Sequence, residues 1–420
     1  MIKKNIFING IINASYLMVG NIISQIINIL AFFYIAKKLG PENFGIYSTI
    51  TAFVGIFGVF TLNGLSKSLI REGSKNLKQF PIVIENTFGI KLLAVFLSFI
   101  ICNIAVFFTN FNYQTKLLIV LFSLELLEIG FRPFFSTIYQ VIEKMKYLAI
   151  FSIITKILFA FFSILFLYLG YSVIAVLISN LASRFFILII NFIFSKKFVI
   201  YKIKPSFKYN NHILKSGITF TLIGFVNTLA TRIDILMISF LSNSTDVGLY
   251  SVAYKVVLEG EIIRGLLSTA FFPIFVKTSK KENNSYLIFK YSCLLLFFVL
   301  TACLIFSYFA KDVVNLIFGE EFYESGIILR LLVFALVFSY YTIPLTLTLQ
   351  STEREKSLLL NSFAIAILNI PLNFIFFHKF GLIGIAYSTL IVYLSSAVFL
   401  SIITYNSISK KSNKPFIYAR

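Results

Sequence analysis

The chain has 420 residues, of which 58% are hydrophobic and only 13% are charged, and its mean hydropathy is +0.90. No soluble fold of this size needs so much apolar surface, so the composition indicates a polytopic membrane protein. The formal net charge of +20 does not indicate a nucleic-acid partner. The basic residues fall in short loops between apolar segments, which is the pattern that marks the cytoplasmic side of a membrane protein.

The apolar segments predict an all-α integral membrane fold with about twelve transmembrane helices. Each segment is roughly 20 to 30 residues long, which is enough to cross a hydrocarbon core of about 30 Å with some tilt. The predicted spans are residues 11–36, 44–66, 82–108, 114–138, 147–169, 172–195, 212–241, 246–272, 286–309, 326–350, 357–378 and 382–404.

Lysine and arginine concentrate at both ends of the chain and in alternate loops. These loops contain Lys67, Arg71, Lys75 and Lys78, then Lys144 and Lys146, then six lysines from Lys196 to Lys215, then Lys277, Lys280, Lys281 and Lys290, and finally Arg354 and Lys356. The opposite loops contain only Lys37, Lys38, Lys116, Lys311 and Lys379. This asymmetry predicts that both termini are cytoplasmic.

The longest polar break, near residues 196–211, separates six predicted spans from six. We therefore expect an N-terminal lobe of residues 1–205, including a cytoplasmic linker, and a C-terminal lobe of residues 206–420. The sequence GIYS at 45–48 matches GLYS at 248–251 at the same place in each half. Because both halves start on the same side, the repeat is expected to be parallel.

The sequence contains few features of an enzyme. It has no GxxxxGK[ST] loop, and no cluster of Cys, His and Asp has the spacing of metal ligands. The three cysteines all lie within apolar spans, which argues against both a disulfide framework and a metal site. We expect no catalytic residues, no cofactor and no bound metal.

Ionisable side chains within the predicted spans are the main candidates for function, because charges in a bilayer are costly and face protein or water. Unpaired bases would suit an anionic ligand, and arginine suits phosphate in particular. The predicted substrate-binding bases are Arg132, Lys156, Arg184, Arg232 and Arg264, and the predicted ion-coupling acids are Asp234, Glu125, Glu128, Glu259 and Glu261. The alternative is that these groups only join helices to one another.

Helical spacing predicts three pairs among the charged residues, which are Glu128 with Arg132, Lys255 with Glu259, and Glu261 with Arg264. Lys91 lies closer to a span end, where a lysine can extend its ammonium group to the interface.

The first span has a polar face, on which Gln25 and Asn28 are expected to bind sugar hydroxyls. Hydrogen bonding between helices is an equal alternative for that face.

Seven short sequences, in order along nearly the whole chain, support a family resemblance. They are LGPENFGIYS at 39–48, RIDILMI at 232–238, VGLYSVA at 247–253, FGEEF at 318–322 with LRLL at 329–332, NIPLN at 369–373, and FGLIGIA at 380–386. With these sequences the chain resembles the lipid-linked oligosaccharide flippases, the O-antigen and polysaccharide-unit translocases of the multidrug/oligosaccharidyl-lipid/polysaccharide exporter superfamily.

The resemblance implies a V-shaped bundle of two six-helix lobes with alternating access, located in the bacterial inner membrane. The implied substrate is an undecaprenyl-diphosphate-linked oligosaccharide used for O-antigen or other surface polysaccharide. A polysaccharide polymerase and a chain-length regulator are the implied partners. The lobes would face each other across a cationic cavity.

Two alternatives stay open at this point. A cation-coupled exporter of small organic cations would share the fold, although the excess of bases within the spans argues against it. A polysaccharide polymerase or ligase would be an enzyme, and the short outer loops argue against that function.

Overall fold

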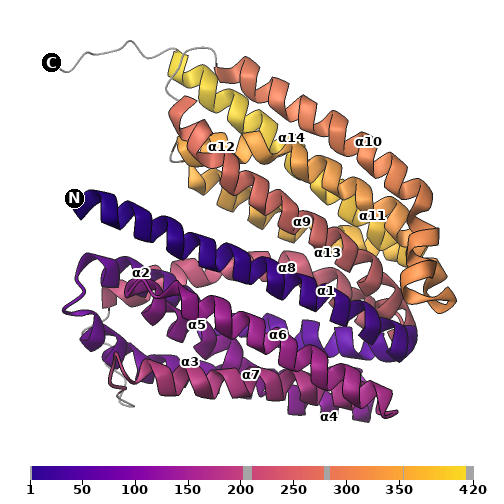
Figure 1. Cartoon of the computed structure of the whole chain (residues 1–420). Helices are drawn as coiled ribbons and strands as arrows, with labels where there is room; N and C mark the ends of the chain where they lie inside the picture. Colours follow the sequence, from indigo (N-terminus) through magenta and orange to yellow (C-terminus); the bar gives the residue numbers. More distant parts are fainter. Residues whose placement is uncertain (1, 202–210, 279–283, 353, 413–420) are drawn as a thin grey trace. The chain divides into compact units, whose positions relative to one another are not determined.

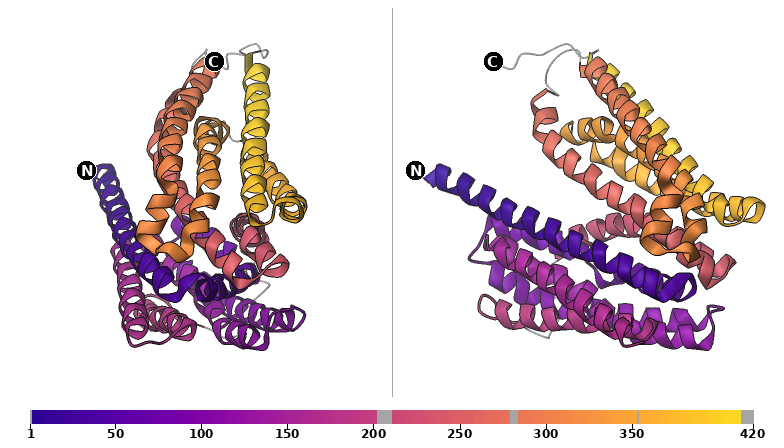
Figure 2. Two further views of the ribbon diagram at one scale, coloured as in Figure 1. Left: turned by 90° about the vertical axis from the view of Figure 1, so that its right-hand side faces the viewer. Right: turned by 45° about the vertical axis from the view of Figure 1, so that its right-hand side comes forward.

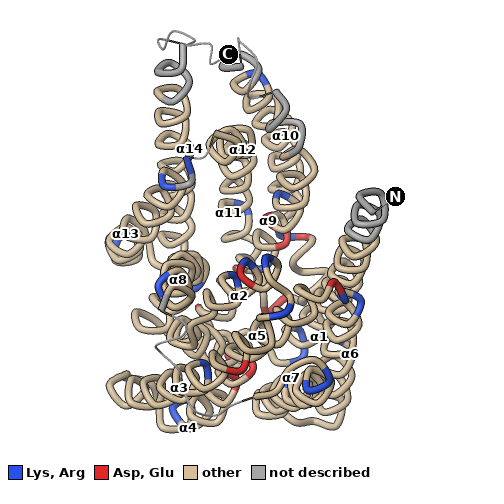
Figure 3. The backbone as a smooth tube through the Cα atoms, turned by 90° about the vertical axis from the view of Figure 1, so that its left-hand side faces the viewer, with Lys and Arg blue, Asp and Glu red and all other residues tan. Residues whose placement is uncertain are grey.

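A computed structural model describes residues 2–201, 211–278, 284–352 and 354–412, and these residues form helices joined by short connections. Lys, Arg, Asp and Glu are sparse along the described chain and are separated by long stretches of other residues (Figure 3). Nine segments of the described residues are long and apolar enough to cross a membrane. The predicted all-α membrane fold is therefore confirmed.

The chain divides into two compact units, residues Met1–Thr228 and Leu229–Arg420. The division falls within helix α8, whose first part belongs to the first unit and whose second part belongs to the second. The predicted boundary between residues 205 and 206 lies outside the described residues and stays a prediction.

The first unit contains the helices up to the first part of α8. Their bounds are α1 Ile2–Phe57, η1 Gly58–Thr61, α2 Gly64–Lys75, α3 Phe80–Phe107, α4 Tyr113–Phe122, α5 Glu125–Val141, α6 Met145–Tyr168, α7 Val173–Ser195 and α8 Asn211–Leu241. Helix α6 packs against both α1 and α7, and the three run alongside one another in Figure 1.

Helix α1 contains the first predicted span and most of the second, which continues through η1 into the start of α2. At Gly40 the backbone has φ 69° and ψ 171°, so the helix breaks there. Glycine adopts a positive φ without strain, and Pro41 suits the first turn of the helical segment that follows. The LGP sequence therefore turns one long helix into two.

Another predicted span is divided into two helices, and here the break falls inside the span. The span 114–138 consists of α4 and α5, which are separated at Ser123 and Leu124. Because α5 begins in the middle of this span, Glu125 and Glu128 lie in its first turn. The positive end of the helix dipole stabilises carboxylates at such a position.

The second unit contains the remaining helices. Their bounds are α9 Ser244–Thr278, α10 Asn284–Phe318, η2 Glu320–Phe322, α11 Tyr323–Tyr341, α12 Ile343–Ser351, α13 Glu355–Phe380 and α14 Leu382–Ser412. Helix α11 packs against α9, α10 and α14, and α13 packs against α14. Figure 2 shows α10, α11 and α14 from two further directions. Gly381, with φ 61°, makes the tight connection between α13 and α14.

Candidate functional site

The charged residues of the first unit form an ionic cluster at the start of α5. One guanidinium nitrogen of Arg184, on α7, lies 3.0 Å from Glu125 Oε1 and 3.0 Å from Glu128 Oε2. Arg132 Nε lies 2.9 Å from the other oxygen of Glu128, as the i,i+4 spacing predicts. Glu125 and Glu128 are 6% and 2% exposed, so these carboxylates depend on the two arginines for compensation of their charge.

Two neutral side chains extend the ionic cluster to α1. Asn180, one turn before Arg184 on α7, accepts a hydrogen bond from Arg184 Nε at 2.5 Å. The Asn180 amide then donates to the hydroxyl of Tyr47 at 3.1 Å. Tyr47 belongs to the GIYS sequence, so the repeated tyrosine of the first half is connected to the charged centre of its own unit.

The two arginines of the cluster differ in what they can contact. The Arg184 side chain is 23% exposed, and both carboxylates are close to one of its nitrogens. The Arg132 side chain is 60% exposed, so much of its guanidinium is free of protein cover. Of these two predicted phosphate ligands, Arg132 is therefore the better placed to meet an incoming anion.

The polar face of the first span makes contacts within the bundle. Asn28 accepts a hydrogen bond from Lys156 Nζ at 2.8 Å, and Ser24 donates to Ser152 at 3.0 Å. Lys156 also lies close enough to Glu128 to interact with it electrostatically. These contacts give Asn28 the interhelical role that was the alternative to sugar binding. Sugar binding by Gln25 stays a prediction.

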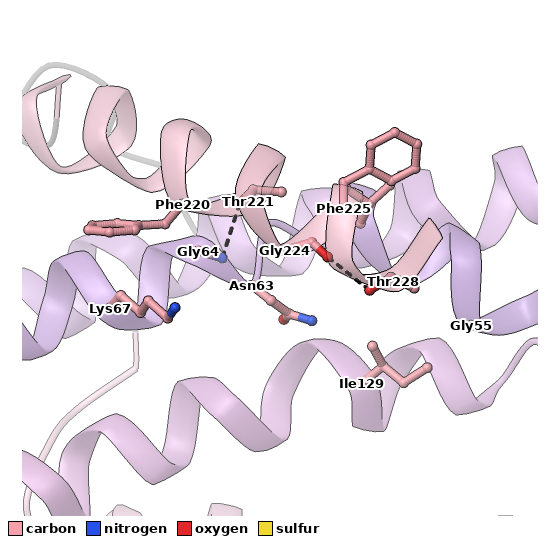
Figure 4. Close-up of a pocket in the computed structure, with 12 residues that line it drawn as sticks. Gly55, Asn63, Gly64, Lys67, Ile129, Phe220, Thr221, Gly224, Phe225 and Thr228 are labelled. Carbon is pink, nitrogen blue, oxygen red and sulfur yellow. Dashed lines mark hydrogen bonds between the residues drawn. The ribbon is translucent and has the colours of Figure 1, made fainter. Parts of the chain in front are cut away.

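A pocket of about 190 Å³ lies beside η1 and the start of α2. Four glycines and four polar side chains contribute to its wall. The residues are Gly55, Gly58, Val59, Asn63, Gly64, Lys67, Ile129, Phe220, Thr221, Gly224, Phe225 and Thr228. Figure 4 shows Lys67 and Asn63 on one side, Ile129 on another, and Thr221 and Thr228 on α8.

The wall of this pocket is fixed by two contacts. The Gly64 N–H donates to the Thr221 hydroxyl at 3.0 Å, across the close contact of α2 and α8. Lys91 is fully buried, and its ammonium group donates to the Thr61 carbonyl and, at 2.9 Å, to Asn63 Oδ1. Lys91 therefore has a structural role within the bundle and does not extend to the interface, because the carbonyl oxygens exposed where α1 and η1 end provide a buried partner.

A polar network surrounds Asp234 in the second unit, where this carboxylate is 2% exposed. It accepts hydrogen bonds from Tyr250 at 2.8 Å, Asn373 at 2.7 Å and Thr389 at 3.1 Å. Asn373 also donates to Asn369. The donors come from α9, α13 and α14, and none of them carries a charge. Among the described residues, Asp234 forms no ion pair.

The other predicted charged residues of the second unit lie mainly on α9. Lys255 Nζ is 2.6 Å from Glu259, and Arg264 is 3.7 Å from Glu261, as the helical spacing predicts. Arg264 also donates to the Ser339 carbonyl and to the Thr342 hydroxyl. Arg232 is half-buried on α8.

Several members of these networks could not be identified from the sequence alone. Tyr47 and Tyr250 were recognised only as a repeat, and Asn373 only as part of a family motif. Asn180 and Thr389 gave no signal, because a single polar residue in an apolar helix does not reveal which neighbour it meets.

The comparisons with known proteins agree with this arrangement of helices. The sequence model of the family described as "Polysaccharide biosynthesis protein" matches residues 11–279. A Shigella flexneri protein named as a candidate O-antigen transporter is 25% identical over 403 residues, which cover 90% of this chain and 93% of that protein. The capsular polysaccharide biosynthesis protein CapF of Staphylococcus aureus is 25% identical over 390 residues, covering 89% and 94%.

Two solved structures share the fold. The lipid II flippase MurJ in an inward closed conformation gives a TM-score of 0.73 at 18% identity, over 94% of this chain and 90% of that one. An inward-facing multidrug resistance transporter of the MATE family, from the MOP superfamily, gives a TM-score of 0.73 at 16% identity, over 93% and 96%. At these identities the likeness establishes the fold.

The ionic cluster predicts a specific pattern of stability. Arg184→Met leaves two buried carboxylates without their shared cation, and removing one partner of a buried ion pair costs about 3–5 kcal/mol. We expect a clearly lower midpoint of thermal unfolding for the purified protein in detergent. The triple variant Glu125→Gln, Glu128→Gln, Arg184→Met removes the charges together and should recover most of the loss. Equal stability of Arg184→Met and the wild type would contradict this account.

Proposed function

We propose that this chain, which belongs to the polysaccharide biosynthesis protein family, translocates lipid-linked oligosaccharide units across the bacterial inner membrane. The family match over residues 11–279 is the observation that carries the proposal. It also confirms the resemblance that the sequence motifs indicated. The names of the two curated relatives refer to O-antigen transport and capsular polysaccharide, which supports a surface polysaccharide as the destination.

The proposed substrate is an undecaprenyl-diphosphate-linked oligosaccharide, moved by alternating access from the cytoplasmic to the periplasmic leaflet. The arrangement of the first unit supports an anionic headgroup. Its ionic cluster contains two carboxylates, and with Lys156 three bases surround them. Arg132, whose side chain is 60% exposed, is the proposed phosphate ligand, because an arginine fork binds phosphate through paired hydrogen bonds.

The pocket beside α2 suits the sugar portion of such a substrate. Its wall offers the amide of Asn63, the ammonium group of Lys67, and two threonine hydroxyls, next to the rings of Phe220 and Phe225. Few polar groups on a mostly apolar wall are typical of small-ligand sites. At Gly224 no other atom lies within 4 Å of the place that a Cβ would take, so the backbone there is open to close approach. We therefore add Asn63 and Lys67 to the proposed substrate-binding residues.

The Asp234 network is the proposed ion-coupling site. A buried carboxylate with only neutral donors is costly when charged, so either a proton or a bound cation would stabilise it. Asn373 Oδ1 is buried beside it without a hydrogen-bond partner, which leaves one more oxygen for a cation. Glu125 and Glu128 fit this role less well, because Arg184 already compensates them. Glu259 and Glu261 stay candidates.

The remaining proposals concern membrane orientation and partners. Both termini are proposed to be cytoplasmic, on the lysine and arginine distribution alone. A polysaccharide polymerase and a chain-length regulator would use the transported units. The transporter names of the relatives agree with the expectation that the chain is not an enzyme.

A cation-coupled multidrug exporter is the second candidate function, because the MATE structure gives the same TM-score as the flippase. The three bases around Glu125 and Glu128 argue against it, since an exporter of organic cations needs a net acidic site.

Transport in proteoliposomes tests the proposed function. A fluorescent undecaprenyl-diphosphate oligosaccharide should become accessible to an impermeant quencher faster in vesicles that contain the protein than in protein-free vesicles. Extrusion of cationic dyes without movement of the lipid-linked sugar would favour the exporter. Transfer of one repeat unit to another would indicate a polymerase instead.

The coupling proposal makes a separate prediction. Asp234→Asn keeps the size of the side chain and removes its charge, so the protein should fold while its response to an ion gradient disappears. We expect the stimulation of transport by a sodium or proton gradient to fall roughly tenfold or more, because the affinity of the site for the coupling ion falls by about the same factor. Asp246→Asn, an acid of α9 outside the network, is the matched control. An unchanged gradient response in Asp234→Asn would refute the assignment.

A further inference from the structure

A second cavity of the first unit has no part in the site described above. It lies between α3 and α7 and the segment that follows α7, with a volume of about 560 Å³. Its wall is apolar except at one end, and it is lined by Phe88, Leu92, Phe192, Lys196, Val199, Ile200 and Tyr201. We call it the α3–α7 groove.

The groove has a rigid aromatic wall. The ring of Tyr201 lies 4.7 Å from that of Phe88 and 5.4 Å from that of Phe192, between ring centroids. The Tyr201 hydroxyl donates to Ser195 Oγ at 2.5 Å, which fixes the orientation of the ring. Three packed rings therefore form this wall, and its one hydroxyl, that of Tyr201, is already hydrogen-bonded to Ser195.

The depth of the groove follows from the helix that forms one side. Helix α3 begins at Phe80, so Phe88 and Leu92 lie roughly 12 and 18 Å along its axis, at about 1.5 Å per residue. Lys196 lies at the opposite end of the groove, directly after the last residue of α7. The groove therefore runs from a charged mouth at the helix ends into the region that hydrocarbon chains occupy.

Lys196 lines the groove at its mouth, Lys197 follows it in the chain, and Lys144 stacks on Phe198, two residues after Lys196. Each of these three lysines has its ammonium group over an aromatic ring. Lys196 lies 4.4 Å from the ring centroid of Phe192, Lys197 lies 5.0 Å from that of Phe194, and Lys144 lies 4.8 Å from that of Phe198. Within the described part of the chain, none of the three forms an ion pair. Stacking positions these cations but leaves their charge uncompensated.

We propose that the α3–α7 groove binds an anionic glycerophospholipid, with one acyl chain along Phe88 and Leu92 and the headgroup phosphate at Lys144, Lys196 and Lys197. An apolar slot that ends in unpaired cations is complementary to this type of molecule at both of its ends. Basic pockets between helices at the cytoplasmic interface are suited to acidic lipid headgroups. The bound lipid would be a structural ligand of the first unit, separate from the transported substrate.

Lipid binding to the purified full chain, followed by native mass spectrometry, tests the proposal with phosphatidylglycerol and phosphatidylcholine as probes. Phosphatidylglycerol should be retained in preference to phosphatidylcholine. The triple variant Lys144→Gln, Lys196→Gln, Lys197→Gln should bind phosphatidylglycerol roughly 100-fold more weakly, since each of the three cations contributes. Leu92→Trp should also lower retention, because the larger side chain fills the groove while the lysines stay.

The matched control is Lys37→Gln, Lys38→Gln, Lys116→Gln, which removes two exposed lysines and one half-buried lysine from the opposite loops. This variant should bind phosphatidylglycerol like the wild type. Equal retention of the two lipids, or equal losses in the two lysine triples, would overturn the proposal. Preferential binding of undecaprenyl diphosphate in the groove over phosphatidylglycerol would overturn it as well. If the first lysine triple does not fold, unchanged binding in Leu92→Trp is the contradicting result.

Discussion

The need to compensate charge within the hydrocarbon layer determines how each unit of this protein is built. In the first unit Glu125 and Glu128 share Arg184, and the dipole of α5 adds to that compensation because both acids lie in its first turn. This shared cation connects α5 to α7, and Asn180 carries the connection to Tyr47 on α1. The ionic cluster is therefore a scaffold in which Arg132 contacts Glu128 through Nε while 60% of its side chain stays exposed.

In the described part of the second unit, the buried carboxylate is stabilised by neutral donors, without a paired cation. Asp234 accepts hydrogen bonds from Tyr250, Asn373 and Thr389 on three helices. The repeated tyrosine thus reaches the buried polar centre of its own unit in both halves of the chain, through Asn180 on α7 in one and directly in the other. In the first centre three bases surround two carboxylates, whereas the carboxylate of the second centre has only neutral donors. This difference is the basis for assigning anion binding to the first unit and ion coupling to the second.

The sequence predicted the fold well, because long apolar runs and the LGP break at Gly40 are local signals. Pairs on one helix, such as Glu128 with Arg132, followed from spacing alone. The partners of Arg184 could not be predicted, since they lie on another helix and packing decides which helices meet. The partner of Lys91 could not be predicted for the same reason, because only the structure shows the carbonyl oxygen of Thr61 beside it.

The central claim is that the two arginines of the ionic cluster have different roles, because Arg184 holds helices together and Arg132 binds the phosphate of the substrate. Binding of undecaprenyl diphosphate to the purified full chain tests it most directly. The account predicts that Arg132→Gln weakens binding roughly tenfold or more, as expected for one charge-assisted contact, while the triple variant Glu125→Gln, Glu128→Gln, Arg184→Met binds like the wild type. Wild-type affinity in Arg132→Gln, together with lost binding in the triple variant, would contradict it.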